Sequence, residues 1–231
     1  MPDIDSYINN TGRIQDELIK RLEKLIKMSS SLNTAQIVEL GSTLNLLEEM
    51  SVLGYSTEVS RLMAQNLMEL TAITASATAL GVELGSVDLV SIQYLQDLEI
   101  TSILGEAQLY ANQLKQELFN GLLTGESVES LAGRLQDNFG AGKVLTSSQK
   151  MVAVSEGFSR LKATTTAKVF EGVPQQKFLL VGPLDGVTRD ACFNMLSFQG
   201  DGLTRDEIDR HSDYSFIERG GFNCRHDWVP V

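Results

Sequence analysis

The chain contains no proline between Pro2 and Pro174, and this absence constrains its fold more than any other feature. Proline ends or kinks a helix, so a long stretch without it permits a series of helices. The same stretch also lacks cysteine, histidine and tryptophan, which all occur later, as Cys192, His211, Cys224, His226 and Trp228. The sequence therefore predicts a mainly α protein, with a helical region over residues 1–172 and a compact C-terminal α+β subdomain over residues 173–231.

Apolar residues in the first two-thirds of the chain recur at the three- and four-residue spacing of amphipathic helices. Between residues 4 and 28 this spacing is kept by Ile14, Leu18, Leu22 and Leu25. The same reasoning predicts helices over residues 34–53, from about 56 to the boundary near Gly81, and over 87–104, 106–123, 128–139 and 147–170. Residues 87–123 could instead form one helix, because a single glycine at position 105 costs only about 1 kcal/mol relative to alanine.

The segment KFLLV, at residues 177–181, is a short apolar run with β character, and the turn signal GPLDG follows it. The chain ends in the extended segment FNCRHDWVPV. We expect a short antiparallel sheet that pairs residues 178–181 with a segment near residues 223–229. Between these strands we expect a short helix near residues 188–196 and a helical turn capped by Thr204.

Composition excludes several classes of function. The net charge of −11 argues against a general nucleic-acid-coating role, because phosphate binding needs clustered Lys and Arg. The first residues lack the basic and apolar regions of a signal peptide, and the most apolar stretch is too polar to span a bilayer. Two cysteines do not make a secreted disulfide framework, so we expect assembly in the cytoplasm. Nucleotide-binding loops, HExxH and a nucleophile elbow are all missing, so we expect no enzymatic activity.

Cysteine and histidine, the residue types that bind zinc, gather in the C-terminal subdomain as Cys192, His211, Cys224 and His226. Only Cys224 and His226 form a close pair, and their spacing is tighter than that of common zinc motifs. A zinc site is therefore one interpretation. In the other, Cys192 and Cys224 are small buried residues that face each other as thiols or as a disulfide. A nucleophilic triad could also be drawn from these residues, but nothing in the spacing favours it.

The segment LDGVTRDAC carries residues that are typical of a structural corner. Asp185 and Thr188 are residue types that form local turns and helix caps, so we expect them to hold the corner between strand and helix. Arg189 could pair with Asp185, with Asp190 or with Asp227.

The segments GPLDGVTRDAC and GGFNCRHDWVPV resemble the C-terminal region of the phage minor head morphogenesis family, which is similar to the F protein of phage Mu. Members carry D-x-x-T-R-x-x-C, a variable stretch, and then G-G-[FY]-N-C-R-H with an apolar ending. The first block is matched by Asp185, Thr188, Arg189 and Cys192. The second is matched by Gly220, Gly221, Phe222, Asn223, Cys224, Arg225, His226, Trp228, Pro230 and Val231. Met195 stands where some members have a second cysteine.

The resemblance covers the chain from about residue 177 onward, and it implies a function. It implies a structural minor head protein of a tailed phage, associated with the portal or the inner capsid and acting in head assembly, genome packaging or ejection. The implied partners are the portal protein, the major capsid protein, packaged DNA and further copies of the chain. The implied location is the virion, assembled in the host cytoplasm, and no cofactor is implied. The alternative function is a zinc-binding regulatory or nucleic-acid-binding module.

Overall fold

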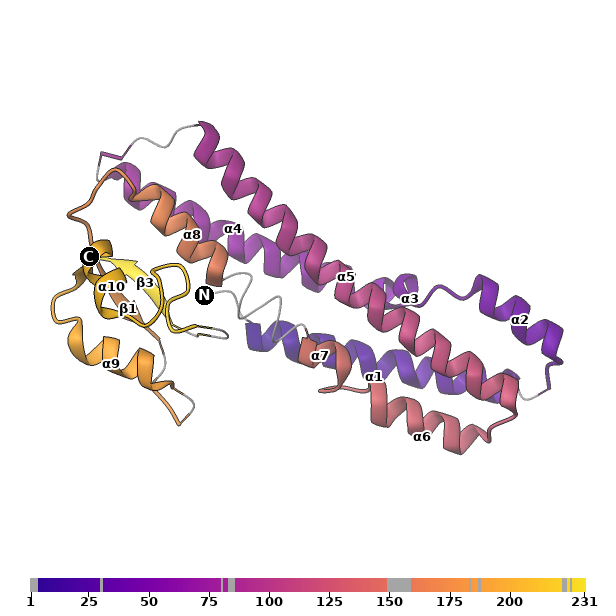
Figure 1. Ribbon diagram of the computed structural model, residues 1–231. Coiled ribbons are helices and arrows are strands. Elements are labelled where there is room, and N and C mark those ends of the chain that lie inside the picture. The colour runs from indigo at the N-terminus through magenta and orange to yellow at the C-terminus, as the bar shows by residue number, and fades with distance from the viewer. Residues whose placement is uncertain are drawn as a thin grey trace. The chain divides into compact units, whose positions relative to one another are not determined.

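The computed structural model describes residues 4–29, 31–79, 81–82, 86–148, 159–182, 184–186, 188–221, 224 and 226–231. It is mainly helical, with a small three-stranded antiparallel sheet near the C-terminus, which confirms the predicted fold class (Figure 1). Contacts divide the chain into two compact units, one made of residues 1–64 and 101–150 and the other of residues 65–100 and 151–231. The boundary predicted between residues 172 and 173 stays a prediction. None of the described helices is long and apolar enough to cross a membrane.

The described residues of the first unit form helices and short connections between them. It holds α1 (Ile4–Ser29), α2 (Thr34–Thr43), α3 (Leu46–Val52), the start of α4 (Tyr55–Ala79), the second half of α5 (Ser86–Thr124), α6 (Val128–Phe139) and α7 (Val144–Ser148). The α1 helix was predicted from its apolar spacing, and it buries Leu18 and Leu22 as that spacing requires. The α6 helix packs along α1. Tyr110 of α5 connects α5 with the end of α6, because its hydroxyl donates to the Phe139 carbonyl over 2.9 Å.

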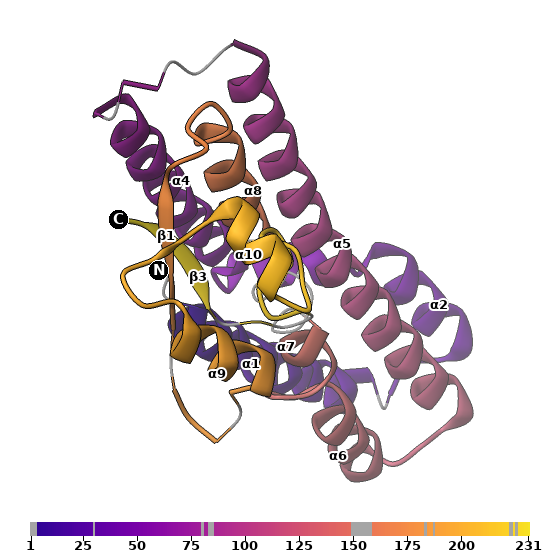
Figure 2. The ribbon, with the colours of Figure 1, turned by 60° about the vertical axis from the view of Figure 1, so that its left-hand side comes forward.

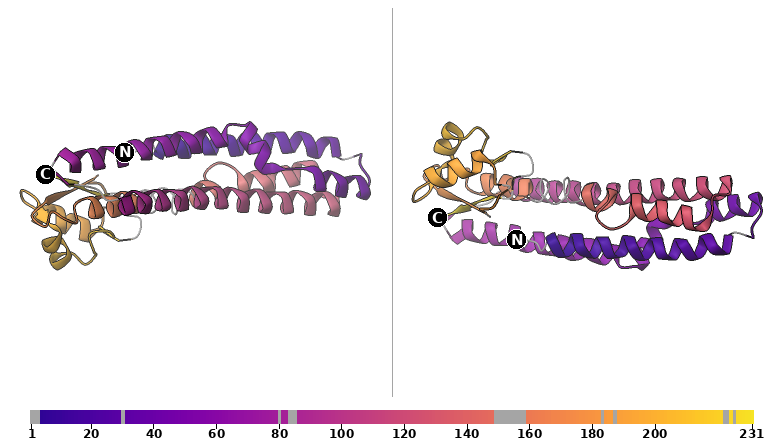
Figure 3. Two further views of the ribbon diagram at one scale, coloured as in Figure 1. Left: turned by 90° about the horizontal axis from the view of Figure 1, so that it is seen from above. Right: turned by 90° about the horizontal axis from the view of Figure 1, so that it is seen from below.

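Two predicted helices differ in the structure. The helix predicted over residues 34–53 is wrong, because Leu44 is extended and the Asn45 side chain accepts from the Glu48 N–H, which starts α3. The helix predicted from residue 147 begins earlier, as α7, and its later part is α8 (Ser159–Val169); residues 149–158 lie outside the described set. Between Ser86 and Thr124 the structure has one continuous helix, which confirms the alternative that residues 87–123 form a single helix (Figure 3).

The second unit is built around the sheet, with the strand order β2-β1-β3. Strands β1 and β3 are labelled in Figure 2. The central strand β1 (Lys177–Val181) pairs antiparallel with β3 (Asp227–Pro230), and Leu180 lies opposite Trp228, which confirms the predicted pairing. The two-residue strand β2 (Leu203–Thr204), on the other side of β1, was not predicted. Helices α9 (Asp190–Phe198) and α10 (Arg205–His211) lie between the strands in sequence. Thr204 caps α10, as predicted.

Aromatic residues fill the centre of this unit. The Phe216 ring meets the Phe178 ring edge to face at 4.9 Å and stacks on the Trp228 ring at 5.6 Å, between centroids. The Trp228 indole donates to the Phe216 carbonyl over 3.0 Å, which satisfies its buried N–H.

A side chain continues the backbone ladder on one edge of β1. Strand β2 pairs only with Lys177 and Phe178. Beyond it, the Gln199 amide accepts from the Leu180 N–H over 2.6 Å and donates to the Leu180 carbonyl over 3.2 Å. Gln199 therefore gives Leu180 the two hydrogen bonds that a longer β2 would have supplied.

Candidate metal centre

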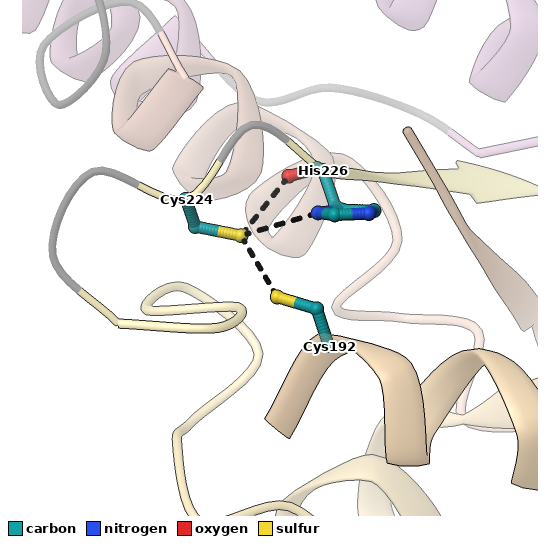
Figure 4. A group of neighbouring side chains, drawn as sticks. All are labelled: Cys192, Cys224 and His226. Carbon is teal, nitrogen blue, oxygen red and sulfur yellow. Dashed lines mark hydrogen bonds between the residues drawn. The ribbon is translucent and has the colours of Figure 1, made fainter. Parts of the chain in front are cut away.

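Two cysteines and one histidine meet inside the second unit (Figure 4). Cys192 lies in the first turn of α9, whereas Cys224 and His226 lie in the segment that leads into β3. Both α9 and β3 contact β1, so the central strand brings the two segments together although 32 residues separate the cysteines. All three residues are at most 3% exposed.

The donor atoms of these residues are close enough to share one ion. The two Sγ atoms are 3.6 Å apart, the Cys224 Sγ and His226 Nδ1 atoms are 3.9 Å apart, and one potential ligand atom from each residue lies within 4.8 Å of the others. In tetrahedral zinc sites the bond lengths imply about 3.8 Å between two sulfurs and about 3.6 Å between sulfur and nitrogen. The separations in the protein are close to these values. The three residues therefore form a buried group that could hold a metal ion.

Two glycines make room for this group. A Cβ atom on Gly220 would lie 2.1 Å from the Cys192 Sγ and 3.1 Å from the Cys224 Sγ. A Cβ atom on Gly182 would lie 2.5 Å from the His226 ring. Separations below 3 Å are not tolerated, so a side chain at either position would displace a donor. The neighbouring Gly221 has a different requirement, since its φ of 84° is in the left-handed region.

Burial favours the neutral thiol form of Cys192. Burial raises the pKa of Cys192 to about 12, the nearby Cys224 sulfur raises it further by its charge and hydrogen bond, and Arg189 and Arg219 oppose the shift. Cys224 donates toward the His226 carbonyl over 3.8 Å. A metal ion bound to Cys192 would have to displace its thiol proton, because only the thiolate is a strong ligand. Without a metal, a neutral buried thiol is a poor nucleophile.

A partly buried ion-pair network lies beside the group. Asp227 accepts from Arg219 over 3.2 Å and from Lys162 over 3.2 Å, and Lys162 also pairs with Glu69 over 3.3 Å. Arg219 additionally donates to the His226 carbonyl over 3.3 Å. Burial opposes the charge on Lys162, but the carboxylates of Asp227 and Glu69 outweigh it and raise the pKa of Lys162. The network therefore fixes the backbone of His226 where β3 begins.

The residues of the first motif block meet those of the second. Arg189 was predicted to pair with a carboxylate, but the structure shows its guanidinium donating to the Gly220 carbonyl over 3.0 Å. Asp185 and Thr188 form the predicted corner, since the Thr188 N–H donates to the Asp185 carbonyl over 2.9 Å and the Asp185 N–H to the Thr188 hydroxyl over 2.9 Å. The sequence block before α9 is thus tied to the glycine that accommodates the sulfurs.

His211 is not part of the metal-binding group. It is exposed at the end of α10, where its ring lies 4.7 Å from the Phe198 ring, and it lines a surface cavity of about 540 Å³ with α9. The predicted set of four ligands therefore has three members that meet in the structure. Asn223 and Arg225, predicted as motif residues, lie outside the described residues.

Sequence reasoning missed three residues that shape the site. Gly182 was assigned only to a turn, and Lys162 was assigned no role beyond its place in the helix predicted over residues 147–170. Arg219 was not connected with this site, although it is 5% exposed and its φ of 57° is unusual for a residue other than glycine. The one available signal was that Arg219 directly precedes two glycines, which marks a tight backbone turn.

Comparisons of this chain with models of known protein families, with curated proteins and with solved structures found no match.

Proposed function

We propose that this protein is a structural minor head protein of a tailed phage. In this proposal it associates with the portal or the inner capsid surface and acts in head assembly, genome packaging or ejection. It works by docking to other proteins and has no catalytic activity. The proposal starts from the resemblance of two separate segments, around Cys192 and around Cys224, to the minor head morphogenesis family.

One observation carries this proposal: the two segments meet in space. Arg189 of the first segment donates to the Gly220 carbonyl of the second over 3.0 Å, and the Cys192 and Cys224 sulfurs are 3.6 Å apart. Gly220 has no room for a side chain because both sulfurs lie beside it. If the two segments resembled the family only by chance, there would be no reason for them to contact each other. The contacts support the view that both segments belong to one structural module.

The state of the site supports a structural role over a catalytic one. A nucleophilic pair needs a sulfur close to a base, and the Cys224 Sγ and His226 Nδ1 atoms are 3.9 Å apart. Both residues are buried, however, and the surface cavity beside α9 is not lined by either of them. Substrate access to the sulfur would require the module to open. The geometry is better suited to holding the segment in place than to turnover.

The test is quantitative mass spectrometry of purified particles of the phage that encodes this chain, together with deletion of its gene. We expect the chain at a low and fixed copy number in the particle, and heads that are defective in DNA content or infectivity after the deletion. A particle that lacks the chain, with full infectivity after deletion, would contradict the proposal.

We propose as a second candidate that Cys192, Cys224 and His226 bind a zinc ion, which would make this unit a zinc-binding module. The observation that favours it is that the sulfur–sulfur separation of 3.6 Å and the sulfur–nitrogen separation of 3.9 Å are close to two edges of a zinc tetrahedron. Two thiolates would neutralise the charge of Zn²⁺, and proton release would make binding stronger as pH rises.

Metal analysis of the purified chain tests this second candidate. We expect one zinc per chain, lost in Cys224→Ser and in His226→Ala. The matched control is His211→Ala, because His211 lies outside the group and its loss should leave the zinc content unchanged. A wild-type chain that stays metal-free after dialysis against zinc would overturn the zinc site and leave the head-protein proposal untouched.

A further inference from the structure

The two cysteines of the chain point toward each other inside the second unit (Figure 4). Cys192 extends from the first turn of α9 and Cys224 from the segment that leads into β3, and their Sγ atoms are 3.6 Å apart. Both are free thiols in this structure. The sequence contains no other cysteine, so a single chain permits only one disulfide pairing.

The surroundings leave room for a bond between the two sulfurs. A disulfide bond is about 2.05 Å long, so the sulfurs would have to approach each other by about 1.5 Å, which small rotations of the two side chains supply. Gly220 lies against both sulfurs and contributes no side chain. A Cβ atom there would lie 2.1 Å from the Cys192 Sγ and 3.1 Å from the Cys224 Sγ. The sulfurs therefore meet over a stretch of bare backbone.

Folding already brings the two sulfurs together. Both α9 and β3 contact the central strand β1, and Arg189, at the start of α9, donates to the Gly220 carbonyl over 3.0 Å. In the unfolded chain the cysteines are 32 residues apart, and closing a loop of that length costs entropy. A disulfide should therefore form more favourably in the folded chain than in the unfolded one.

We propose that Cys192 and Cys224 are a reversible redox switch, which closes to a disulfide when the protein meets a small-molecule disulfide such as oxidised glutathione. The thiolate of one cysteine attacks a sulfur of oxidised glutathione and expels one glutathione thiolate. The other cysteine then attacks the protein sulfur of this mixed disulfide and expels the second glutathione. The protein loses two electrons and two thiol protons, and oxidised glutathione becomes two glutathione thiols.

The two states of the switch differ in what they hold together. The disulfide joins α9 covalently to the segment before β3. It also removes both thiolates, so the disulfide and a bound metal ion are alternative states of the same sulfurs. Each cysteine is at most 3% exposed, so the folded protein reacts slowly with an oxidant and keeps its thiols in a reducing compartment. The inference concerns this module alone and does not depend on the head-protein proposal.

The test is the equilibrium of the full chain with a glutathione buffer that contains EDTA, measured by thiol alkylation and intact-mass spectrometry. The equilibrium is approached both from the reduced chain and from chain oxidised beforehand in urea, so that slow access to the buried sulfurs does not decide the outcome. It is determined without urea and in urea that unfolds the second unit. By thermodynamic linkage, the ratio of the two disulfide equilibrium constants is the factor by which the disulfide stabilises the fold.

We expect the disulfide to be on the order of 100-fold more favourable in the folded chain, because it closes a loop between cysteines 32 positions apart. The urea midpoint, followed by the fluorescence of the buried Trp228, should be higher for the oxidised than for the reduced chain. The control Cys192→Ser should form glutathione adducts only. A disulfide that is no more favourable in the folded chain than in urea, or one that links two chains, overturns the proposal.

Discussion

Removing the charge of Asp227 should destabilise the second unit strongly. Its side chain is 7% exposed and accepts from Arg219, which is 3% exposed, over 3.2 Å. At an effective dielectric constant of about 20, two unit charges at this distance attract by about 5 kcal/mol. In Asp227→Asn the amide oxygen can still accept a hydrogen bond, but Arg219 is left as a buried charge without a counter-ion. Breaking a buried pair from one side costs about 3–5 kcal/mol, so we expect a loss of about 3 kcal/mol.

The assay is urea unfolding followed by tryptophan fluorescence, since Trp228 is the only tryptophan and is buried in the same unit. Lys162→Met should cost less than Asp227→Asn, because Asp227 would keep Arg219 as its partner. The control is Glu171→Gln, whose ion pair with Lys168 is exposed and should leave the unfolding curve in place. An Asp227→Asn variant that unfolds at the same urea concentration as this control would refute the reasoning.

Three further predictions follow from other contacts. Gly220→Ala should lower the free energy of unfolding by about 1–3 kcal/mol in the same urea assay, because the new Cβ atom would overlap the Cys192 sulfur; an unchanged midpoint would show that the sulfurs can move aside. Tyr110→Phe should cost about 1 kcal/mol in thermal unfolding, because the Phe139 carbonyl loses a buried donor, and a stability equal to wild type would contradict this. Burial raises the pKa of Glu99 from 4.5 to about 7, so the folded protein favours the protonated carboxyl group. The free energy of unfolding is therefore unaffected by Glu99 below pH 4.5 and decreases as pH rises from 4.5 to about 7. Glu99→Gln should flatten the fall in melting temperature between pH 4.5 and pH 7, and parallel curves for the two proteins would argue against the shift.

The segments with a regular apolar pattern were predictable, because burial of their apolar residues alone determines whether they form a helix or a strand. The apolar spacing in α1 and the β-branched and apolar run in β1 each match one element, and the structure has both. The pairing of β1 with β3 followed because the two extended segments enclose the rest of the subdomain. In α5 the helix continues through Gly105, which is exposed with open space around it, so the small cost of glycine did not end the helix.

Other features depend on contacts that a sequence pattern does not carry. The break at Leu44 and Asn45 arises because the Asn45 side chain caps a new helix instead of continuing the preceding one. An asparagine within a helical apolar pattern is compatible with either outcome, so the sequence alone does not predict the break. Strand β2 has two residues, too few for an alternating pattern. The grouping of Cys192 with Cys224 was anticipated, but the exclusion of His211 and the pairing of Arg219 with Asp227 depend on how distant segments meet.

The Gln199 side chain has a consequence for how the sheet behaves toward other chains. An edge strand with free N–H and carbonyl groups can recruit a strand from another molecule, which leads to aggregation or swapping. On the β2 side, Gln199 occupies both backbone groups of Leu180. On the opposite edge, β3 is four residues long and includes Pro230, which has no N–H to offer. These two features limit growth of the sheet beside Leu180 of β1 and at Pro230 of β3.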